Sequence, residues 1–198
     1  MDIKELHNIM PIANIPSVME HGILSHNLRR RLRIRSRSVA MNVIQDMRKK
    51  KTVMGGRSLH DYVNLYFDAH NPMLSKVREY NDEICVLRIS PEVLDLPEVV
   101  ISDRNAAADF VSFYPYPDGL EKLDFDLIYA KFWLHRDNPM REFRHKSIKC
   151  AEVLVPDRVE SQYILGAYVY NTRAKKSLRD EDFSGNIIVK SGLFFNQG

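Results

Sequence analysis

Short apolar runs alternate with polar stretches along this chain. Apolar runs of roughly four to eight residues that are bounded by turn-forming residues are typical of strands. They predict strands at 6–12, 60–67, 83–89, 99–103, 149–155, 164–170 and 186–190. Apolar residues at helical spacing predict helices at 38–51 and 123–133, and a short charged helix is expected between the last two strands. Strands mixed with short helices predict an α+β fold.

A short helix is marked at both ends between residues 14 and 22. Asn14 is suited to the N-cap, Pro16 to the first turn and Gly22 to the left-handed position that ends a helix. His7 lies on the strand before this helix. A histidine among apolar residues is more often a hydrogen-bonded core residue than a ligand contact, so His7 alone does not identify a site.

The strand at 149–155 carries a carboxylate in its middle. The strand period of two places Glu152 on one face with Cys150 and Leu154, and the other face is apolar. A carboxylate among apolar residues is costly unless a cation or a hydrogen-bond donor meets it, which makes Glu152 a candidate for binding a polar ligand. The alternative is an edge strand with one face in water.

Composition bounds the class of protein. The 198 residues are 44% hydrophobic and 28% charged, which is typical of one globular domain spanning 1–198. Cys85 and Cys150 lie in apolar runs, which favours buried thiols in a reducing, cytoplasmic compartment. No apolar run approaches the ~20 residues of a membrane span, and the first residues lack the apolar core of a signal peptide. We therefore expect no membrane association.

The net charge of +3 hides a strong asymmetry. Residues 27–57 hold eleven Lys or Arg and one acid, for a net +10, whereas the rest of the chain carries −7. A basic block on an acidic body indicates a site for a polyanion. A solvated or disordered arm is the alternative, and the cations at 48–51 would also suit the C-terminal end of a helix.

Two further stretches are candidates for binding a second substrate. Residues 135–149 are polar and basic, and we expect a mobile loop that leads into the Glu152 strand. The aromatic stretch 110–119 is expected to be a loop whose rings could stack on splayed bases, although most of them are expected to pack on the core.

Several common chemistries are absent from the sequence. There is no G-x-G-x-x-G or Walker pattern, no zinc-ligand spacing, no G-x-S-x-G elbow and no convincing Cys–His pair. We therefore expect no metal, and any nucleotide must be bound by an unusual frame.

Three separated pieces together resemble one family. They are His7 on an early strand, Tyr66-Phe67 followed by Pro72-Met73-Leu74, and the strand around Glu152. This His/Tyr/Glu arrangement resembles the ADP-ribosyltransferase fold. The stretch 60–67 and the segment with Arg48 are similar more narrowly to DarT, the DNA ADP-ribosyltransferase toxins of bacterial toxin–antitoxin pairs.

The resemblance implies a split β-sheet cleft flanked by short helices, with NAD as co-substrate. It implies transfer of ADP-ribose to a base in single-stranded DNA by a monomer, and a cognate antitoxin with ADP-ribosyl hydrolase activity. The basic segment 27–57 would contact DNA, and 135–149 would be the substrate-recognition loop.

The resemblance also assigns roles to residues. Glu152 would bind the nicotinamide ribose and stabilise the oxocarbenium-like charge, and Arg48 would act at the target base. The cofactor-binding residues would be His7, Asn14, Tyr66 and Phe67. The DNA-binding residues would be Arg33, Arg35, Arg37, Lys49, Lys50, Arg141 and Arg144.

The target base is the finest of these expectations. Many thymine-modifying relatives carry Arg in the loop after the Tyr-Phe strand, where this chain has His70. The sequence at 64–67 also looks closer to the guanine-modifying branch. Guanine is therefore favoured over thymine.

Two other functions remain open. An RNA 2′-phosphotransferase of the same fold would also use NAD and be small and basic, but it need not possess Glu152. A nucleic-acid binding module without catalysis would rest only on the +10 segment and the aromatic stretch. Replacing Glu152 with Ala would leave the function of such a module unchanged.

Overall fold

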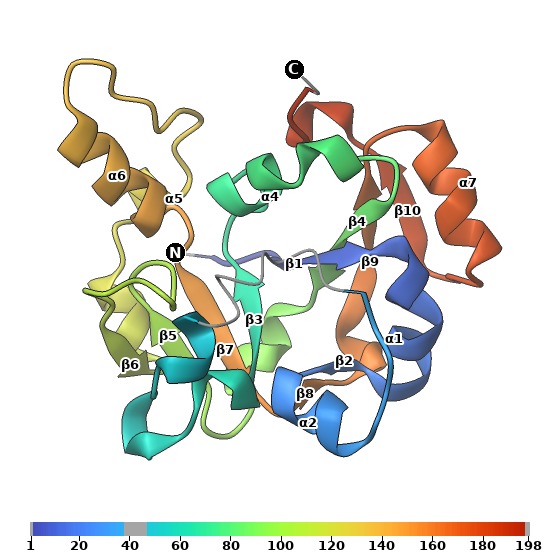
Figure 1. Ribbon diagram of the computed structural model, residues 1–198, viewed down its shortest axis with the longest axis horizontal. Helices are drawn as coiled ribbons and strands as arrows, with labels where there is room; N and C mark the ends of the chain where they lie inside the picture. Colours follow the sequence, from blue (N-terminus) through green and yellow to red (C-terminus); the bar gives the residue numbers. More distant parts are fainter. Residues whose placement is uncertain (1, 38–46, 197–198) are drawn as a thin grey trace.

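A mixed sheet forms the body of the protein, and the computed structural model describes residues 2–37 and 47–196. In that part of the chain, eight strands follow the order β10-β9-β4-β1-β3-β7-β5-β6 (Figure 1). Their bounds are β1 Leu6–Pro11, β3 Tyr62–Tyr66, β4 Ile84–Ile89, β5 Val100–Ser102, β6 Phe113–Pro115, β7 Glu152–Pro156, β9 Ile164–Val169 and β10 Asn186–Val189. A small second sheet pairs β2 (Ile23–Leu24) with β8 (Arg158–Val159).

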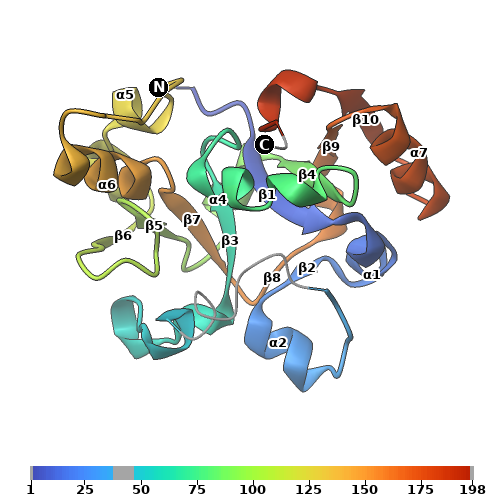
Figure 2. The same cartoon turned by 45° about the horizontal axis from the view of Figure 1, so that its top comes forward.

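Short helices surround this sheet. They are α1 Ile15–His21, α2 His26–Arg31, α4 Pro72–Lys76, α5 Phe125–Ile128, α6 Pro139–Ile148 and α7 Thr172–Asp180. Helices α1 and α7 lie at one end of the sheet, and α5 and α6 lie at the other (Figures 1 and 2). Single 3-10 turns connect several elements: η1 Ile12–Asn14, η2 Met54–Gly56, η3 Leu59–Asp61, η4 Arg78–Tyr80, η5 Pro91–Asp95, η6 Asp118–Lys122, η7 Ser161–Tyr163 and η8 Ser191–Leu193.

The sheet is split between β1 and β3. Strand β1 pairs with β4 over six residues, but it pairs with β3 only at His7 opposite Tyr66. Beyond this point the two strands diverge, and the Asn8 amide nitrogen spans the gap to donate to the Asn64 carbonyl at 3.0 Å. The predicted α+β fold with a split sheet is confirmed, because the split follows directly from this single pairing.

Strand β7 is central, since it pairs with β3 on one side and β5 on the other. The alternative of an exposed edge strand is therefore wrong. The predicted alternation holds: Val153 and Val155 join the main core, and Leu154 joins a separate cluster on the opposite face. Cys85 and Cys150 are buried free thiols, as predicted, and burial raises the pKa of each to about 12.

Several local predictions need correction. The helix expected at 123–133 is only the four residues of α5, and the strand expected from residue 60 begins at Tyr62, after η3. The aromatic stretch 110–119 contains strand β6. The basic run after residue 27 begins as helix α2. The helix expected at 38–51 falls partly outside the described residues, of which 47–50 are helical.

The largest correction concerns 135–149, which is not a loop throughout. Helix α6 occupies most of it, with Pro139 in the first turn. The side chain of Asn138 accepts a hydrogen bond from the Arg141 amide at 2.9 Å, which caps the helix. Among the described helices, none is long and apolar enough to cross a membrane.

Candidate active site

Four residues of neighbouring strands lie directly opposite one another. His7 on β1 opposes Tyr66 on β3, Tyr66 opposes Glu152 on β7, and Glu152 opposes Ser102 on β5. Residues paired in this way share a face of the sheet, so their side chains are neighbours. Glu152 is completely buried, and Tyr66 and His7 are 5% and 8% exposed. The three residues of the predicted His/Tyr/Glu arrangement therefore form one row, which we call the triad row.

The Glu152 carboxylate is held at both oxygens. Oε1 accepts from the Ala106 backbone amide at 2.9 Å, and Oε2 accepts from Arg48 Nη1 at 3.1 Å. Arg48 is itself buried. A carboxylate offers about four acceptor positions, so two remain for a ligand. The positive guanidinium and the amide make a charged group tolerable in this dry location.

Strand β5 also fixes the backbone at Glu152. The Glu152 amide donates to Ser102 Oγ at 3.1 Å, and that hydroxyl donates to the Arg104 carbonyl at 2.7 Å. Beside them, burial and the negative charge of Glu152 raise the pKa of Tyr66 well above its usual value. Tyr66 therefore stays neutral in the row and acts by packing and hydrogen bonding.

His7 is oriented by a carboxylate that the sequence did not single out. His7 Nε2 lies 3.2 Å from Glu5 Oε1, and Glu5 also accepts from Arg88 Nε and Tyr168 Oη, each at 2.7 Å. The bond to His7, then those from Tyr168 and Arg88, lower the pKa of Glu5 to about 2. His7 Nδ1 is buried and has no hydrogen-bond partner among the described residues.

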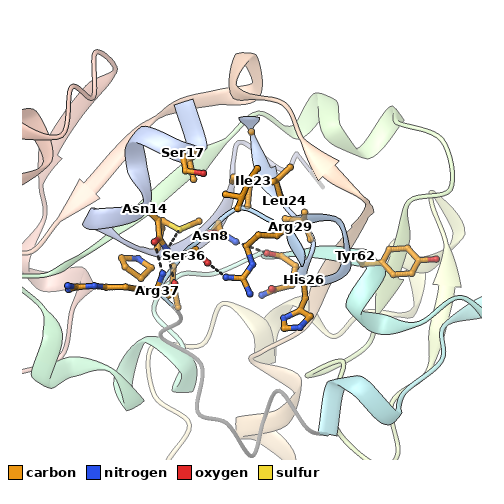
Figure 3. Close-up of a pocket in the computed structure, with 18 of the residues that line it drawn as sticks. Asn8, Asn14, Ser17, Ile23, Leu24, His26, Arg29, Ser36, Arg37 and Tyr62 are labelled. Atoms are coloured by element: carbon orange, nitrogen blue, oxygen red, sulfur yellow. Dashed lines mark hydrogen bonds between the residues drawn. The ribbon is translucent and has the colours of Figure 1, made fainter. Parts of the chain in front are cut away.

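A cleft of about 390 Å³ opens where β1 and β3 diverge (Figure 3). Its walls come from β1, α1, β2, α2, η3 and β3, together with Ile34, Ser36, Arg37 and Arg48. Three arginines and two histidines line it, and no Asp or Glu does within the described ranges: the five are Arg29, Arg37, Arg48, His26 and His60. A cleft with this lining attracts an anion.

One wall of the cleft depends on Asn14. Its amide oxygen accepts from the Arg37 amide at 2.8 Å and its nitrogen donates to the Arg37 carbonyl at 2.7 Å (Figure 3). Arg29 donates to the Ser36 hydroxyl in the same segment. Asn14 precedes α1 but makes no capping hydrogen bond with its side chain. It therefore lines the cleft mainly as the support of Arg37.

The rings of His26 and His60 stack at 4.3 Å in the lining of this cleft. Burial and the nearby Arg29 and Arg30 lower the pKa of His26. This histidine is therefore mostly neutral at neutral pH, and the stack offers a flat surface beside the arginines.

One predicted cofactor-binding residue lies away from the site. Phe67 belongs to the main core, 1% exposed, with its ring edge-on to Phe125 at 5.8 Å. As the residue after Tyr66, it points to the opposite face of the strand, so the structure does not bring it to the triad row.

The predicted DNA-binding cations are all on the surface. The seven residues are Arg33, Arg35, Arg37, Lys49, Lys50, Arg141 and Arg144, and each is exposed. None of them forms an ion pair within 2–37 and 47–196. Their charges are therefore available to an external anion.

Sequence reasoning missed Glu5, Ser102, Ala106 and Arg29. Ser102 and Ala106 act through a hydroxyl and a backbone amide, which leave no pattern in a sequence. Arg29 belongs to the basic segment but was not singled out. In the described part of the chain, no group of three or more His, Cys, Asp or Glu is placed to hold a metal.

Comparison with known proteins identifies the family. The model of the family described as "ssDNA thymidine ADP-ribosyltransferase, DarT" matches residues 7–195. A fusion of a DNA ADP-ribosyl transferase with a DNA ADP-ribosyl glycohydrolase from Thermosipho africanus is 29% identical over 97% of this chain and 49% of its own length. A DNA ADP-ribosyl transferase from a Thermus species is 32% identical over 76% of this chain and 73% of its own.

Solved structures agree. Thermosipho africanus DarTG in complex with ADP-ribose superposes with a TM-score of 0.82 at 27% identity, over 98% of this chain and 51% of that one. A Thermus DarT in complex with ADP-ribosylated single-stranded DNA also gives 0.82, at 24% identity, over 98% and 97% of the two chains. The present chain spans about half the length of the Thermosipho fusion. The family model covers most of the chain and confirms the family predicted from the sequence. The chain therefore belongs to the DarT family of single-stranded DNA ADP-ribosyltransferases.

Proposed function

We propose that this protein transfers ADP-ribose from NAD to a base of single-stranded DNA. The observation that carries the proposal is the placement of Glu152, buried and in one row with Tyr66 and His7, beside a cleft lined by arginines. A Thermus relative has been solved with NAD and with carba-NAD, and a Thermosipho relative with ADP-ribose.

The lining and the volume of the cleft support the binding of a dinucleotide. Its arginines suit a diphosphate, and its volume of about 390 Å³ lies within the ~300–1,000 Å³ usual for ligand pockets. Two buried polar atoms at the split, His7 Nδ1 and Asn8 Oδ1, have no partner among the described residues. Unpaired buried polar atoms are costly, and hydroxyl groups of a bound ribose would satisfy them. Tyr66 would pack beside the nicotinamide.

Glu152 would stabilise the transition state. Its two remaining acceptor positions would take hydrogen bonds from the hydroxyls of the nicotinamide ribose. As the bond from that ribose to nicotinamide breaks, positive charge develops on the sugar, and the fixed negative charge stabilises it. The Ala106 amide and Arg48 hold the carboxylate in place before the reaction, so little reorganisation is needed.

Arg48 would act on the target base, which accepts the ADP-ribose. An arginine side chain keeps its charge in proteins, so Arg48 is better suited to orienting the target base than to removing its proton. Nη1 is committed to Glu152, which leaves other donors of the guanidinium for the base. Loss of Arg48 would therefore affect both the position of Glu152 and that of the acceptor.

We further propose one ADP-ribosyltransferase domain in which 27–57 and 135–149 flank the DNA. Both segments hold exposed arginines and lysines that form no ion pair with the described residues, which supports this. Arg37 and Arg48 also line the cleft, so the basic segment would serve the diphosphate of NAD as well as DNA.

For the base we propose thymidine, the nucleoside named in the family description. The preference for guanine drawn from the sequence is not confirmed. That preference rested partly on His70. The structure places His70 outside the cleft described above: it lines a second cavity and makes a hydrogen bond with the Leu193 carbonyl at 2.8 Å. The partner would be a hydrolase that removes the mark, since a relative carries such an activity in the same chain. This pairing supports a role as a toxin.

The deciding experiment incubates the purified protein with NAD and single-stranded oligonucleotides that differ in one base, read by mass spectrometry. We expect a gain of one ADP-ribose unit on thymidine-containing strands. Glu152→Ala should abolish it while DNA affinity and folding stay close to those of the natural protein. Glu160→Ala, which removes a half-exposed carboxylate outside the site, is the matched control and should remain active.

Each other outcome has a meaning. A gain only on guanine-containing strands keeps the reaction and reverses the base. Activity of the Glu152→Ala protein equal to that of the Glu160→Ala protein would contradict the proposed role of Glu152. Removal of a 2′-phosphate from RNA, with no DNA modified, would favour the phosphotransferase, and DNA binding without either reaction would favour the non-catalytic module.

A further inference from the structure

A second cavity, of about 880 Å³, lies apart from the first cleft. It is open to solvent and is bordered by His70, α4, residues 131–134, Lys146 of α6, Tyr170 and the C-terminal segment 191–196. No residue lines both cavities. The proposed reaction with NAD does not use this space, so its lining requires another explanation.

Aromatic rings form much of its wall: Phe132, Trp133, Tyr170, Phe194 and Phe195. Phe195 meets Trp133 edge-on at 5.5 Å and stacks on His70 at 4.3 Å. The hydrogen bond between His70 and the Leu193 carbonyl fixes the C-terminal segment in this position. The wall is thus built by specific contacts between three distant parts of the chain.

A buried cation supports the same wall. Lys149 is completely buried, donates to Asp68 Oδ2 at 2.6 Å and to the Ile128 carbonyl at 2.9 Å, and lies 5.6 Å from the centre of the Trp133 ring. Lys149 is three residues before Glu152. Lys149 therefore links the Trp133 side of the cavity to the segment that leads into β7.

The charges on the wall are all positive. Lys76, Lys131 and Lys146 line the cavity, and none of its fifteen described residues is Asp or Glu. Lys146 also pairs with Glu142 at 2.6 Å on α6, while Lys131 lies over the Phe132 ring at 5.3 Å. Aromatic faces together with lysines suit a base with a phosphate attached, because bases stack on rings and phosphates attract cations.

The cavity is also close to the triad row along the chain. Four peptide units link Tyr66 to His70, which limits their Cα separation to about 14 Å. Lys146 precedes Glu152 by six residues, part of them in α6. The chain thus limits the distance between the lining of the cavity and the triad row, which permits one DNA strand to reach both.

We propose that the second cavity binds a nucleotide that flanks the target base of the DNA strand. This rests on the proposed function, because the target base must lie at Glu152 in the same complex. A free nucleotide shares the chemistry of base and phosphate, so the test must separate a strand from a mononucleotide.

Trp133 provides a direct readout, since it is the only tryptophan of the chain and lines this cavity. We would titrate the full chain, with and without carba-NAD, with a thymidine-containing oligonucleotide and with thymidine monophosphate. The oligonucleotide should quench Trp133 over the concentrations at which its own fluorescence anisotropy shows binding. The mononucleotide should have no effect over that range.

A variant tests the consequence for the reaction. Phe132 is 72% exposed and lines neither the first cleft nor the triad row, so Phe132→Ala should fold and keep the NAD site intact. We expect kcat/KM to fall about tenfold for a long strand, as for the loss of one stacked base. Thymidine monophosphate, which has no flanking nucleotide, should react equally with both proteins. Tyr80→Ala, an exposed aromatic outside both cavities, is the control.

The failures of the two proposals differ. Quenching of Trp133 by DNA without any DNA modification would contradict the proposed function and leave the cavity as a nucleotide site. Modification of DNA with unchanged Trp133 fluorescence and no effect of Phe132→Ala at any strand length would overturn the assignment of the second cavity. Equal quenching by thymidine monophosphate would overturn the flanking strand in favour of a free nucleotide.

Discussion

Glu152 and Arg48 illustrate what individual residues contribute. They are 104 positions apart, yet a hydrogen bond of 3.1 Å joins them in a location where the carboxylate is completely buried. A buried pair of this kind adds little net stability, because the desolvation of both groups offsets their attraction. Its value is instead to hold a charged acceptor ready in a dry site, which is what a developing positive charge requires.

Glu5 allows a prediction about pH. Because the pKa of Glu5 is lowered from 4.5 to about 2 in the folded protein, its contribution to stability is complete above pH 4.5. That contribution is lost progressively as the pH falls from 4.5 towards 2. Glu5→Gln should therefore lower the free energy of unfolding at neutral pH by about 1–3 kcal/mol.

Urea unfolding at several pH values between neutral and strongly acidic checks this. The natural protein should lose more stability below pH 4.5 than the Glu5→Gln protein, so the two curves should converge. Parallel curves would contradict the prediction, because Glu5 would then contribute no stability that depends on its protonation.

At the scale of elements, the turn from α1 into β2 sets one wall of the cleft. Gly22 ends α1 with a φ of +77°, and a Cβ at this position would lie 2.5 Å from the Val159 carbonyl oxygen of β8. Gly22, Ile23 and Leu24 all line the cleft. The close approach of the two strands therefore depends on the absence of a side chain.

We predict that Gly22→Ala lowers the free energy of unfolding by about 1–3 kcal/mol, since both the backbone conformation and the space oppose it. It should also raise the KM for NAD if the cleft binds NAD. Gly192→Ala is the control, because a Cβ there meets nothing within 4 Å. Equal stability of the two variants, measured by urea unfolding, would show that β8 moves aside at low cost.

Helix α6 shows why some elements were not predicted. Its capping residue Asn138 and Pro139 mark a helix start. However, Met140 and Phe143 are 78% and 73% exposed, and only His145 and Ile148 are buried. Since so little of this helix faces the core, its sequence lacks the apolar stripe from which a helix is usually inferred. For that reason the pattern predicted a basic loop.

At the scale of the whole molecule, the charge distribution bears on the proposed encounter with DNA. The +10 of residues 27–57 faces solvent at Arg33, Arg35 and Arg37, and α6 adds Arg141 and Arg144. Cations on two segments that are proposed to flank the DNA would attract a strand from a distance and release its counterions on binding.

DNA affinity should therefore fall steeply with salt. The expected slope of log K against log salt is about −0.7 for each phosphate neutralised on a single strand. Replacing Arg141 and Arg144 together by Ala should make the slope shallower by about 1.4. Lys176→Ala, on α7 at the other end of the sheet, should leave it unchanged (Figure 1). A flat salt dependence of the natural protein would count against these segments as the contact surface.

The sequence by itself determined most strands of the main sheet and the buried cysteines, and it singled out Glu152 as a candidate. These features follow from local patterns: the strand period places Glu152 among apolar neighbours, whatever the rest of the fold. The resemblance to a family grouped His7, Tyr66 and Glu152 into one site, and the register of β1, β3 and β7 aligns them in space.

Only the tertiary structure decided how that site is built. The single pairing between β1 and β3 opens the cleft, and residues far apart in the chain supply the groups that hold it: Glu5 beside His7, Ala106 and Arg48 at Glu152, and Asn14 beside Arg37. The tertiary structure also packed Phe67 against Phe125 in the core and formed the second cavity with the C-terminal segment. Such contacts depend on long-range packing and on backbone amides, whose positions no local pattern of side chains encodes.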